Sequence, residues 1–231
     1  LFFCQFFKTL ICNIVQNIFF ELLQAALWER EVDLQVFQGD WSWERLLQAY
    51  QDHALMGVVA HTILNLPSNY QPDFRLQQFI FQTVGSLVQT RQKHNQVIAT
   101  ILSDFEQEGC HPVLLKGQGL ASLYPSRCIR TIGDIDIYVT PSKYDVAKSL
   151  INKHADAEEI SHATEIEAEH HYKIKIEDVI FEIHHLAGDP GNPNYKKRFH
   201  VESAKYLTPE KVSTAILNLE KGNKEIPIPS I

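Results

Sequence analysis

The sequence predicts an α+β fold, in which a helical N-terminal half precedes a small mixed-sheet unit. Up to about residue 108, apolar residues recur with the spacing of α-helices. Beyond Gly109 they fall into short alternating runs bounded by glycine and proline, a pattern typical of strands. One of those runs, residues 134–139, carries two acids on the same side. We therefore predict a helical region over residues 1–108 and a catalytic α/β unit over residues 109–231.

The composition is that of an ordinary soluble globular protein. The chain has 231 residues, of which 45% are hydrophobic and 21% are charged. Its formal net charge of −7 argues against a general nucleic-acid binder, because such proteins usually carry a basic face. The four cysteines show no CxxC spacing, so we expect reduced, mostly buried thiols in a cytoplasmic protein rather than disulfides or structural zinc.

The first 28 residues are apolar in pairs, but polar residues interrupt them throughout. A transmembrane helix needs about 20 mostly apolar residues in succession, so the sequence predicts no membrane span here. A buried amphipathic helix is the simplest interpretation. The alternative is that the N-terminal helices bind a protein partner or lie on a membrane surface.

Further helices follow in the first half. Asp40 is expected to be the N-cap of a helix over residues 41–50. A second helix is expected over residues 53–64. The longest is expected over residues 73–107, because apolar residues keep a helical period there and Gly109 follows as the C′ glycine that ends it.

The elements expected after Gly109 are short and alternate in type. They are a strand at 112–115, one or two helical turns at 119–124, a strand at 134–139, a helix at 141–153, strands at 170–177 and 179–186, a loop at 189–193 and an extended tail at 226–231. Glu177 and Asp178 form the turn between the last two strands, which therefore make a hairpin. On its first strand, Tyr172, Ile174 and Ile176 share one face, and Lys173 and Lys175 share the other.

The most informative feature is the pair Asp134 and Asp136. Residues spaced i, i+2 on a strand point to the same face, while Ile135 and Ile137 point to the opposite face and can pack in a core. Two carboxylates held a few ångströms apart repel each other, and a divalent metal removes that repulsion. The alternative is a solvated edge strand whose acids have no ligand.

A third acid, Glu182, lies in a later alternating strand and shares a face with His184. A two-metal mechanism of nucleotidyl transfer needs carboxylates that bind the metal ions. It also needs a carboxylate that helps the attacking hydroxyl to lose its proton. We therefore predict Asp134, Asp136 and Glu182 as metal-binding and catalytic residues. The alternative for Glu182 is an exposed strand acid of the kind that many sheets carry.

The run Lys116-Gly117-Gln118-Gly119 follows a strand and opens a helix. Free backbone N–H groups at such a turn suit a triphosphate, and the lysine adds a positive charge. Arg130 precedes the acid strand and could hold phosphate oxygens in a bidentate fork. We predict these five residues as nucleotide-binding. The alternatives are a structural turn for the first four and a surface arginine that balances the acids for Arg130.

Histidines are numerous, and the pairs His170-His171 and His184-His185 suggest a zinc site at first sight. Adjacent strand residues point in opposite directions, so each pair can offer only one ligand to a given site. We therefore set zinc aside and expect His184 to support the site or to face the substrate.

The central motifs together resemble the uncharacterised bacterial nucleotidyltransferase family of the DNA polymerase beta-like superfamily. They are Val113-Leu114-Leu115-Lys116-Gly117, Leu123-Tyr124-Pro125, the segment from Arg130 to Val139, and Phe181-Glu182-Ile183-His184. The likeness spans about residues 40–190. Where the superfamily usually has Gly-Ser in the first turn, this chain has Lys116-Gly117, as is normal for the subgroup.

The resemblance implies a polymerase beta-like fold, Mg²⁺ or Mn²⁺, and a nucleoside triphosphate such as ATP. It carries Asp134, Asp136 and Glu182 over as the catalytic acids and Lys116-Gly117 as the phosphate turn. The predicted function is therefore transfer of a nucleoside monophosphate from the triphosphate to a hydroxyl acceptor on a small molecule, a protein or an RNA. The alternative is a non-catalytic module of the same fold that binds a nucleotide or a partner.

Overall fold

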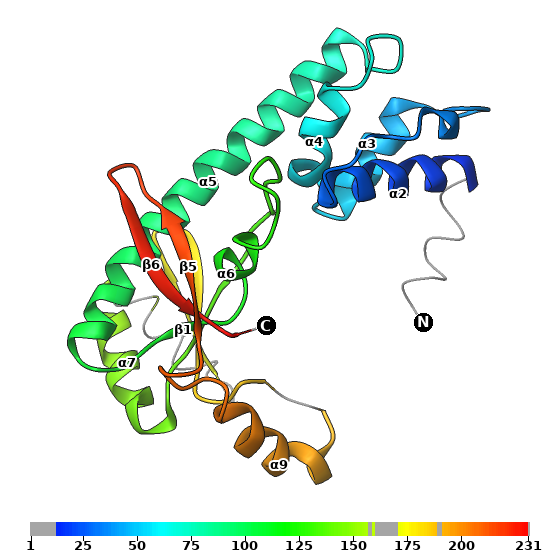
Figure 1. Cartoon of the computed structure of the whole chain (residues 1–231). Helices are drawn as coiled ribbons and strands as arrows, with labels where there is room; N and C mark the ends of the chain where they lie inside the picture. Colours follow the sequence, from blue (N-terminus) through cyan, green and yellow to red (C-terminus); the bar gives the residue numbers. More distant parts are fainter. Residues whose placement is uncertain (1–12, 157–158, 160–170, 189–190, 231) are drawn as a thin grey trace. The chain divides into compact units, whose positions relative to one another are not determined.

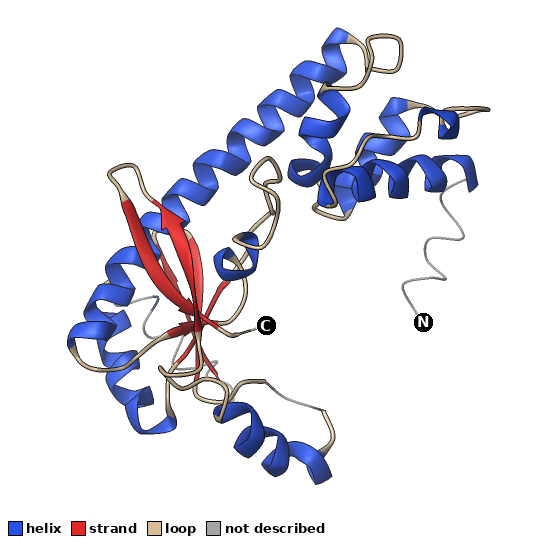
Figure 2. Ribbon diagram, in the orientation of Figure 1, coloured by secondary structure: helices blue, strands red, loops and turns tan. Residues whose placement is uncertain are grey.

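The computed structural model describes residues 13–156, 159, 171–188 and 191–230 (Figure 1). Packing divides them into two compact units. The first contains the residues up to Thr90 together with Tyr124–Thr131, and the second contains Arg91–Leu123 and the residues from Ile132 onward. The strands all belong to the second unit (Figure 2). The predicted α+β class, with a helical first half and a small mixed sheet, is confirmed, whereas the domain boundary at Gly109 remains a prediction.

The first unit consists of helices and their connections. These are α2 (Asn13–Leu27), the 3₁₀ helix η1 (Leu34–Val36), α3 (Trp43–Asp52), α4 (Met56–Leu64) and the first part of α5 (Phe74–Gln107). Their core includes Phe19 and Tyr50, whose rings stack with centroids 4.4 Å apart. The Tyr50 hydroxyl donates a hydrogen bond to the Phe19 carbonyl at 2.8 Å, so the buried phenol keeps a partner. The predicted amphipathic helix is thus present from Asn13, and residues 1–12 lie outside the described part.

Two predicted helix starts in this unit are wrong. The N-cap of α3 is Ser42, whose hydroxyl accepts a hydrogen bond from the Arg45 amide at 3.4 Å, and Asp40 lies two residues before it. Helix α4 begins at Met56 rather than at residue 53. Ala54 adopts a left-handed φ of +56°, which interrupts the helical backbone between α3 and α4.

The long helix matches its prediction closely. The Asp73 side chain accepts a hydrogen bond from the Leu76 amide at 2.9 Å at its start. Gly109, with a φ of +63°, follows its end, and the Cys110 amide returns to the Phe105 carbonyl at 2.8 Å. Cys110 and Cys128 are buried free thiols, as expected, and the other two cysteines are not described.

The second unit is built on a four-stranded sheet of order β1-β2-β4-β3. The strands are β1 (Val113–Leu114), β2 (Ile135–Tyr138), β3 (His171–Ile176) and β4 (Val179–His184). Strands β1 and β3 are antiparallel to their neighbours, whereas β2 and β4 are parallel. Besides the second part of α5, its described helical elements include α6 (Gln118–Ala121), the 3₁₀ helix η2 (Pro141–Lys143), α7 (Tyr144–Asn152) and α9 (Pro193–Ala204). One face of the sheet packs with α5 and α7 in a single hydrophobic core.

The predicted β3–β4 hairpin is confirmed, and its turn fixes the register. Glu177 and Asp178 both have positive φ, +48° and +66°, as a two-residue type I′ turn requires. This turn places Ile176 opposite Val179 and Lys173 opposite Glu182. The side-chain alternation predicted for β3 therefore holds in the structure.

A second hairpin, β5 (Ser213–Asn218) with β6 (Asn223–Ile228), and helix α9 were not predicted. For α9, the signals were an Asn192 cap followed by proline, which we assigned to a loop. The β5–β6 hairpin depends on contacts with α5 that are distant in sequence. Asn95 donates to the Asn218 carbonyl at 2.9 Å, and the Lys224 ammonium donates to the Ser103 hydroxyl at 2.8 Å.

The segment Tyr124–Thr131 is held against α4 by a close backbone approach. The Ile129 amide donates to the Gly57 carbonyl at 2.8 Å, and the Thr131 hydroxyl donates to the Ala54 carbonyl at 2.9 Å. A Cβ at Gly57 would lie 2.2 Å from the Ile129 carbonyl oxygen. Gly57 is therefore required by this contact, although glycine weakens a helix interior.

We expect Gly57→Ala and Gly85→Ala to have opposite effects on stability. Both glycines lie inside helices, but a Cβ at Gly85 would meet no atom within 4 Å. Gly85→Ala should raise the free energy of unfolding by about 0.5–1 kcal/mol through helix propensity. Gly57→Ala should lower it by about 1–2 kcal/mol, because overpacking outweighs that gain. Urea unfolding followed by tryptophan fluorescence measures both values, and equal shifts would contradict the close approach.

Candidate functional site

The candidate site lies on the face of the four-stranded sheet opposite its core. In β2 and β4, Ile135, Ile137, Phe181 and Ile183 are fully buried members of the core. Because successive strand residues point to opposite faces, Asp136 and Glu182 point to the other side. The parallel register places these two acids directly opposite each other. The strands that build the core therefore also bring two carboxylates together.

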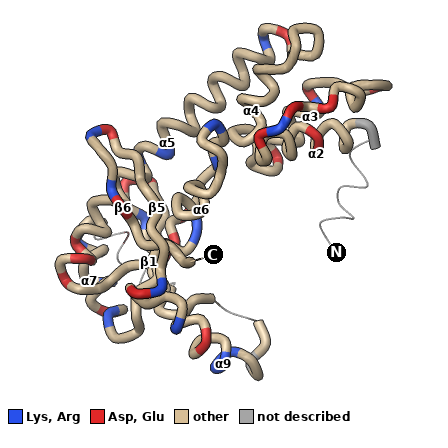
Figure 3. The backbone as a smooth tube through the Cα atoms, in the orientation of Figure 1, with Lys and Arg blue, Asp and Glu red and all other residues tan. Residues whose placement is uncertain are grey.

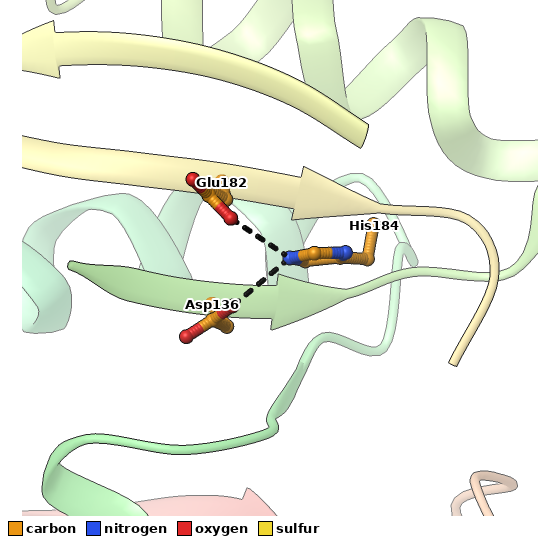
Figure 4. Close-up of side chains that lie close together, drawn as sticks. All are labelled: Asp136, Glu182 and His184. Carbon is orange, nitrogen blue, oxygen red and sulfur yellow. Dashed lines mark hydrogen bonds and ion pairs between the residues drawn. The ribbon is translucent and has the colours of Figure 1, made fainter. Parts of the chain in front are cut away.

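His184 completes a compact group with the two acids (Figure 4). Its Nε2 lies 3.1 Å from Asp136 Oδ1 and 3.6 Å from Glu182 Oε2. One donor atom from each residue lies within 4.8 Å of the others. The Asp136 side chain is fully buried, and those of His184 and Glu182 are 9% and 13% exposed. The group is thus largely shielded from solvent.

Two lysines pair with these acids. Lys116 Nζ donates to Asp136 Oδ1 at 2.7 Å, and Lys173 Nζ donates to Glu182 Oε1 at 2.9 Å. Lys116 follows β1, whereas Lys173 lies on β3 directly opposite Glu182. Basic and acidic residues are interspersed along the described chain (Figure 3), and in the site they are matched one to one.

These contacts set the charge state of the site. Burial of the Asp136 carboxylate opposes its ionisation, but hydrogen bonds from His184 and Lys116 outweigh that effect and lower the pKa of Asp136. The hydrogen bond to Asp136 raises the pKa of Lys116, and the one to Glu182 raises the pKa of Lys173. Near neutral pH, Asp136 is therefore ionised and both lysines are protonated.

The three grouped residues fit a divalent cation. Asp136 Oδ2 is buried and accepts no hydrogen bond from the described part of the chain. A buried carboxylate oxygen without a donor is unfavourable, and a cation would satisfy it. Two carboxylates with one imidazole make a donor set suited to Mn²⁺, while Mg²⁺ relies more on the oxygens. Because a carboxylate only accepts, His184 Nε2 carries a proton in its bond to Asp136, and a cation there would require the other tautomer.

Asp134 occupies a different position from the other predicted acids. It precedes β2 by one residue, is exposed, and is not a member of the compact group. Its negative charge nevertheless contributes to the raised pKa of both Lys116 and Lys173, so it lies within electrostatic range of the site. A direct metal-binding role for Asp134 remains a prediction.

Two positions of the Lys116–Gly119 turn favour glycine, one because of its backbone angles and one because of close packing. Gly117 has φ +61° and ψ −118°, which side-chain-bearing residues rarely adopt. Gly119 packs so closely on β6 that a Cβ would lie 2.8 Å from Ile228 Cγ2. The Gln118 side chain is buried, and Lys116 is exposed. Helix α6 has only four residues, so its dipole adds little to anion binding.

Arg130 belongs to the first unit, where its guanidinium contacts the Thr131 carbonyl at 3.4 Å. Its nucleotide-binding role remains a prediction. Of the predicted site residues, the structure therefore groups Asp136, Glu182 and Lys116 by direct contacts. Asp134 and Arg130 lie outside those contacts.

Sequence reasoning placed His184 at the site without assigning it as a ligand, and it missed Lys173. The signal for Lys173 was available, since a two-residue turn at Glu177-Asp178 sets Lys173 opposite Glu182. As expected for adjacent strand residues, His185 points elsewhere, and its ring packs on Tyr144 with centroids 4.4 Å apart. His170 lies outside the described residues.

Comparison with known proteins identifies the family. The family model described as "Uncharacterised nucleotidyltransferase" matches residues 40–220, most of the chain. No curated protein and no solved structure matches significantly. Among the helices of the described residues, none combines the length and apolar character needed to cross a bilayer. The matched region contains the sheet, the glycine turn and the grouped acids, and the chain belongs to the uncharacterised nucleotidyltransferase family.

Proposed function

We propose that this protein is a metal-dependent enzyme that transfers a nucleoside monophosphate from a nucleoside triphosphate to a hydroxyl acceptor. The observation that carries the proposal is the grouping of Asp136, Glu182 and His184, together with a buried Asp136 Oδ2 that accepts no hydrogen bond from the described residues. Family membership supports nucleotidyl transfer in general. The metal requirement, the triphosphate donor and the hydroxyl acceptor are part of our proposal and do not follow from family membership.

Asp136 and Glu182, with His184 Nε2, would hold the divalent cation, and Asp134 would add negative charge at the edge of the site. Mg²⁺ or Mn²⁺, when bound, supplies positive charge that stabilises the phosphate oxygens and the leaving pyrophosphate. Asp136 suits this role because it is ionised, buried and held in the regular strand β2. Glu182 suits it because the parallel register sets it opposite Asp136.

The proposed reaction is an in-line displacement at the α-phosphorus. The acceptor hydroxyl oxygen forms a bond to that phosphorus, and the bond from the phosphorus to the pyrophosphate oxygen breaks. Glu182 is proposed to accept the proton that the hydroxyl loses. Lys116 and the backbone of Gly117, Gln118 and Gly119 are proposed to bind the phosphate chain.

A non-catalytic module would bind the nucleotide without transferring it. The two lysine–acid pairs are the observation that favours this alternative, because they neutralise the site without a metal. The buried Asp136 Oδ2 favours the enzyme, because neither lysine satisfies it. Binding and transfer must therefore be measured separately.

We expect Mn²⁺ with a nucleoside triphosphate to raise the melting temperature of the wild type, since a ligand that binds only the folded state stabilises it. ATP, GTP, CTP and UTP should each be tested. Asp136→Asn should abolish the metal-dependent part of the shift, because it removes the central charge. Asp145→Asn, the same change at an exposed residue of α7, is the control and should keep it. A full metal-dependent shift in Asp136→Asn would place the metal elsewhere.

We expect Glu182→Gln to lower nucleotidyl transfer by at least about 100-fold, the scale of general acid–base catalysis. Affinity for the triphosphate should fall far less, because Asp136 and Lys116 are retained. Glu225→Gln changes an exposed strand acid on β6 and should leave both quantities unchanged. Single-turnover transfer of labelled nucleotide to acceptors in cell extract measures the rate, and calorimetry measures the affinity.

Two results would count against these assignments. Full transfer by Glu182→Gln would remove Glu182 from the mechanism. Triphosphate binding by the wild type without transfer to any acceptor would favour the binding module.

A further inference from the structure

Both acids of the candidate site are neutralised by lysines in the structure. Lys116 Nζ lies 2.7 Å from Asp136 Oδ1, and Lys173 Nζ lies 2.9 Å from Glu182 Oε1. Two carboxylates are thus matched by two ammonium groups, which offsets the repulsion between acids on neighbouring strands. The two grouped carboxylates therefore have counter-charges without a metal.

A divalent cation held by Asp136 and Glu182 would lie close to both ammonium groups at these positions. The ammonium groups bind the same two carboxylates that the cation would need. Like charges a few ångströms apart repel strongly in a partly buried site. Entry of the cation would therefore favour displacement of the lysines.

The lysines are the members of the cluster with room to move. The Lys116 and Lys173 side chains are 59% and 40% exposed, whereas those of Asp136 and Glu182 are 0% and 13% exposed. A lysine carries its charge on a flexible four-carbon stem. The ammonium groups can therefore leave on the solvent side while the strands keep the acids in place.

We propose that Lys173 is a phosphate-binding residue whose ammonium group neutralises Glu182 until the cation enters. When displaced, this group lies at the edge of the site and binds the phosphate chain that arrives with the cation. This inference rests on the proposed function and adds a residue from β3 to a site otherwise built from β2, β4 and the turn after β1.

The chain contains a matched control for Lys173. Lys175 lies two residues along the same strand and on the same face, with 47% of its side chain exposed. Its ammonium group pairs with Asp178 of the hairpin turn at 3.0 Å instead of with a site acid. Lys175→Gln changes the net charge of the protein by the same amount as Lys173→Gln, but it leaves the ion pair between Lys173 and Glu182 intact.

The experiment compares Lys173→Gln with Lys175→Gln in two binding measurements. The first is Mn²⁺ affinity without nucleotide, from the loss of the free Mn²⁺ signal in electron paramagnetic resonance. The second is affinity for inorganic tripolyphosphate at saturating Mn²⁺, measured by calorimetry. Tripolyphosphate carries no nucleobase, so the result does not depend on which nucleotide the protein prefers.

We expect Lys173→Gln to bind Mn²⁺ at least about threefold more tightly, because a competing, partly exposed ion pair is lost. The same variant should bind tripolyphosphate about tenfold more weakly, because a charge-assisted hydrogen bond is lost. Lys175→Gln should change neither affinity by more than about twofold. Opposite shifts in one variant distinguish this role from a structural one, which would weaken both or neither.

The inference is overturned if the wild type binds Mn²⁺ but Lys173→Gln binds it no more tightly, or if tripolyphosphate affinity is unchanged. Equal effects of the two substitutions would also overturn it, because they would reflect net charge. A wild type that binds no Mn²⁺ would instead reject the proposed function. Should Lys173→Gln fail to fold by circular dichroism, Lys173→Met keeps the aliphatic stem and takes its place with the same expected shifts.

Discussion

The parallel pairing of β2 with β4 is the constraint on which the site depends. It sets Asp136 directly opposite Glu182, although like charges on neighbouring strands repel. Burial of Asp136 increases the cost, because fewer water molecules reach its carboxylate. His184, Lys116 and Lys173 reduce that cost through direct contacts. One carboxylate oxygen of Asp136 still accepts no hydrogen bond from the described residues, and a bound cation would satisfy it.

The same two strands stabilise the core and position the chemistry. Ile135 and Ile183 pack against α5 and α7 on one face, and the acids lie on the other. A shift of one residue in either strand would place an acid in the core and an isoleucine in the site, so burial specifies the register strongly. Because regular strands hold the acids, their separation does not depend on a mobile loop. The lysine side chains that pair with the acids are more exposed than the acids themselves.

Much of the fold followed from local signals in the sequence. The period of the apolar residues indicated the long α5 helix, with Gly109 after its end. The two-residue turn at Glu177-Asp178 indicated the β3–β4 hairpin, although the pairing of Lys173 with Glu182 that follows from its register was missed. The β5–β6 hairpin was missed because it is stabilised by α5, which is distant in sequence. The cap at Ser42 was missed because Asp40 offered an equally suitable residue type two positions earlier.

The sequence by itself determined which residues could carry the chemistry and which strand faces they occupy, because side-chain alternation is a local property of the backbone. It also determined the short turn after β1, since Gly117 adopts a positive φ. Only the tertiary structure decided that β2 and β4 pair in parallel, that His184 reaches Asp136, and that Asp134 lies outside the compact group. These relations join segments separated along the chain, and their register depends on how the whole core packs.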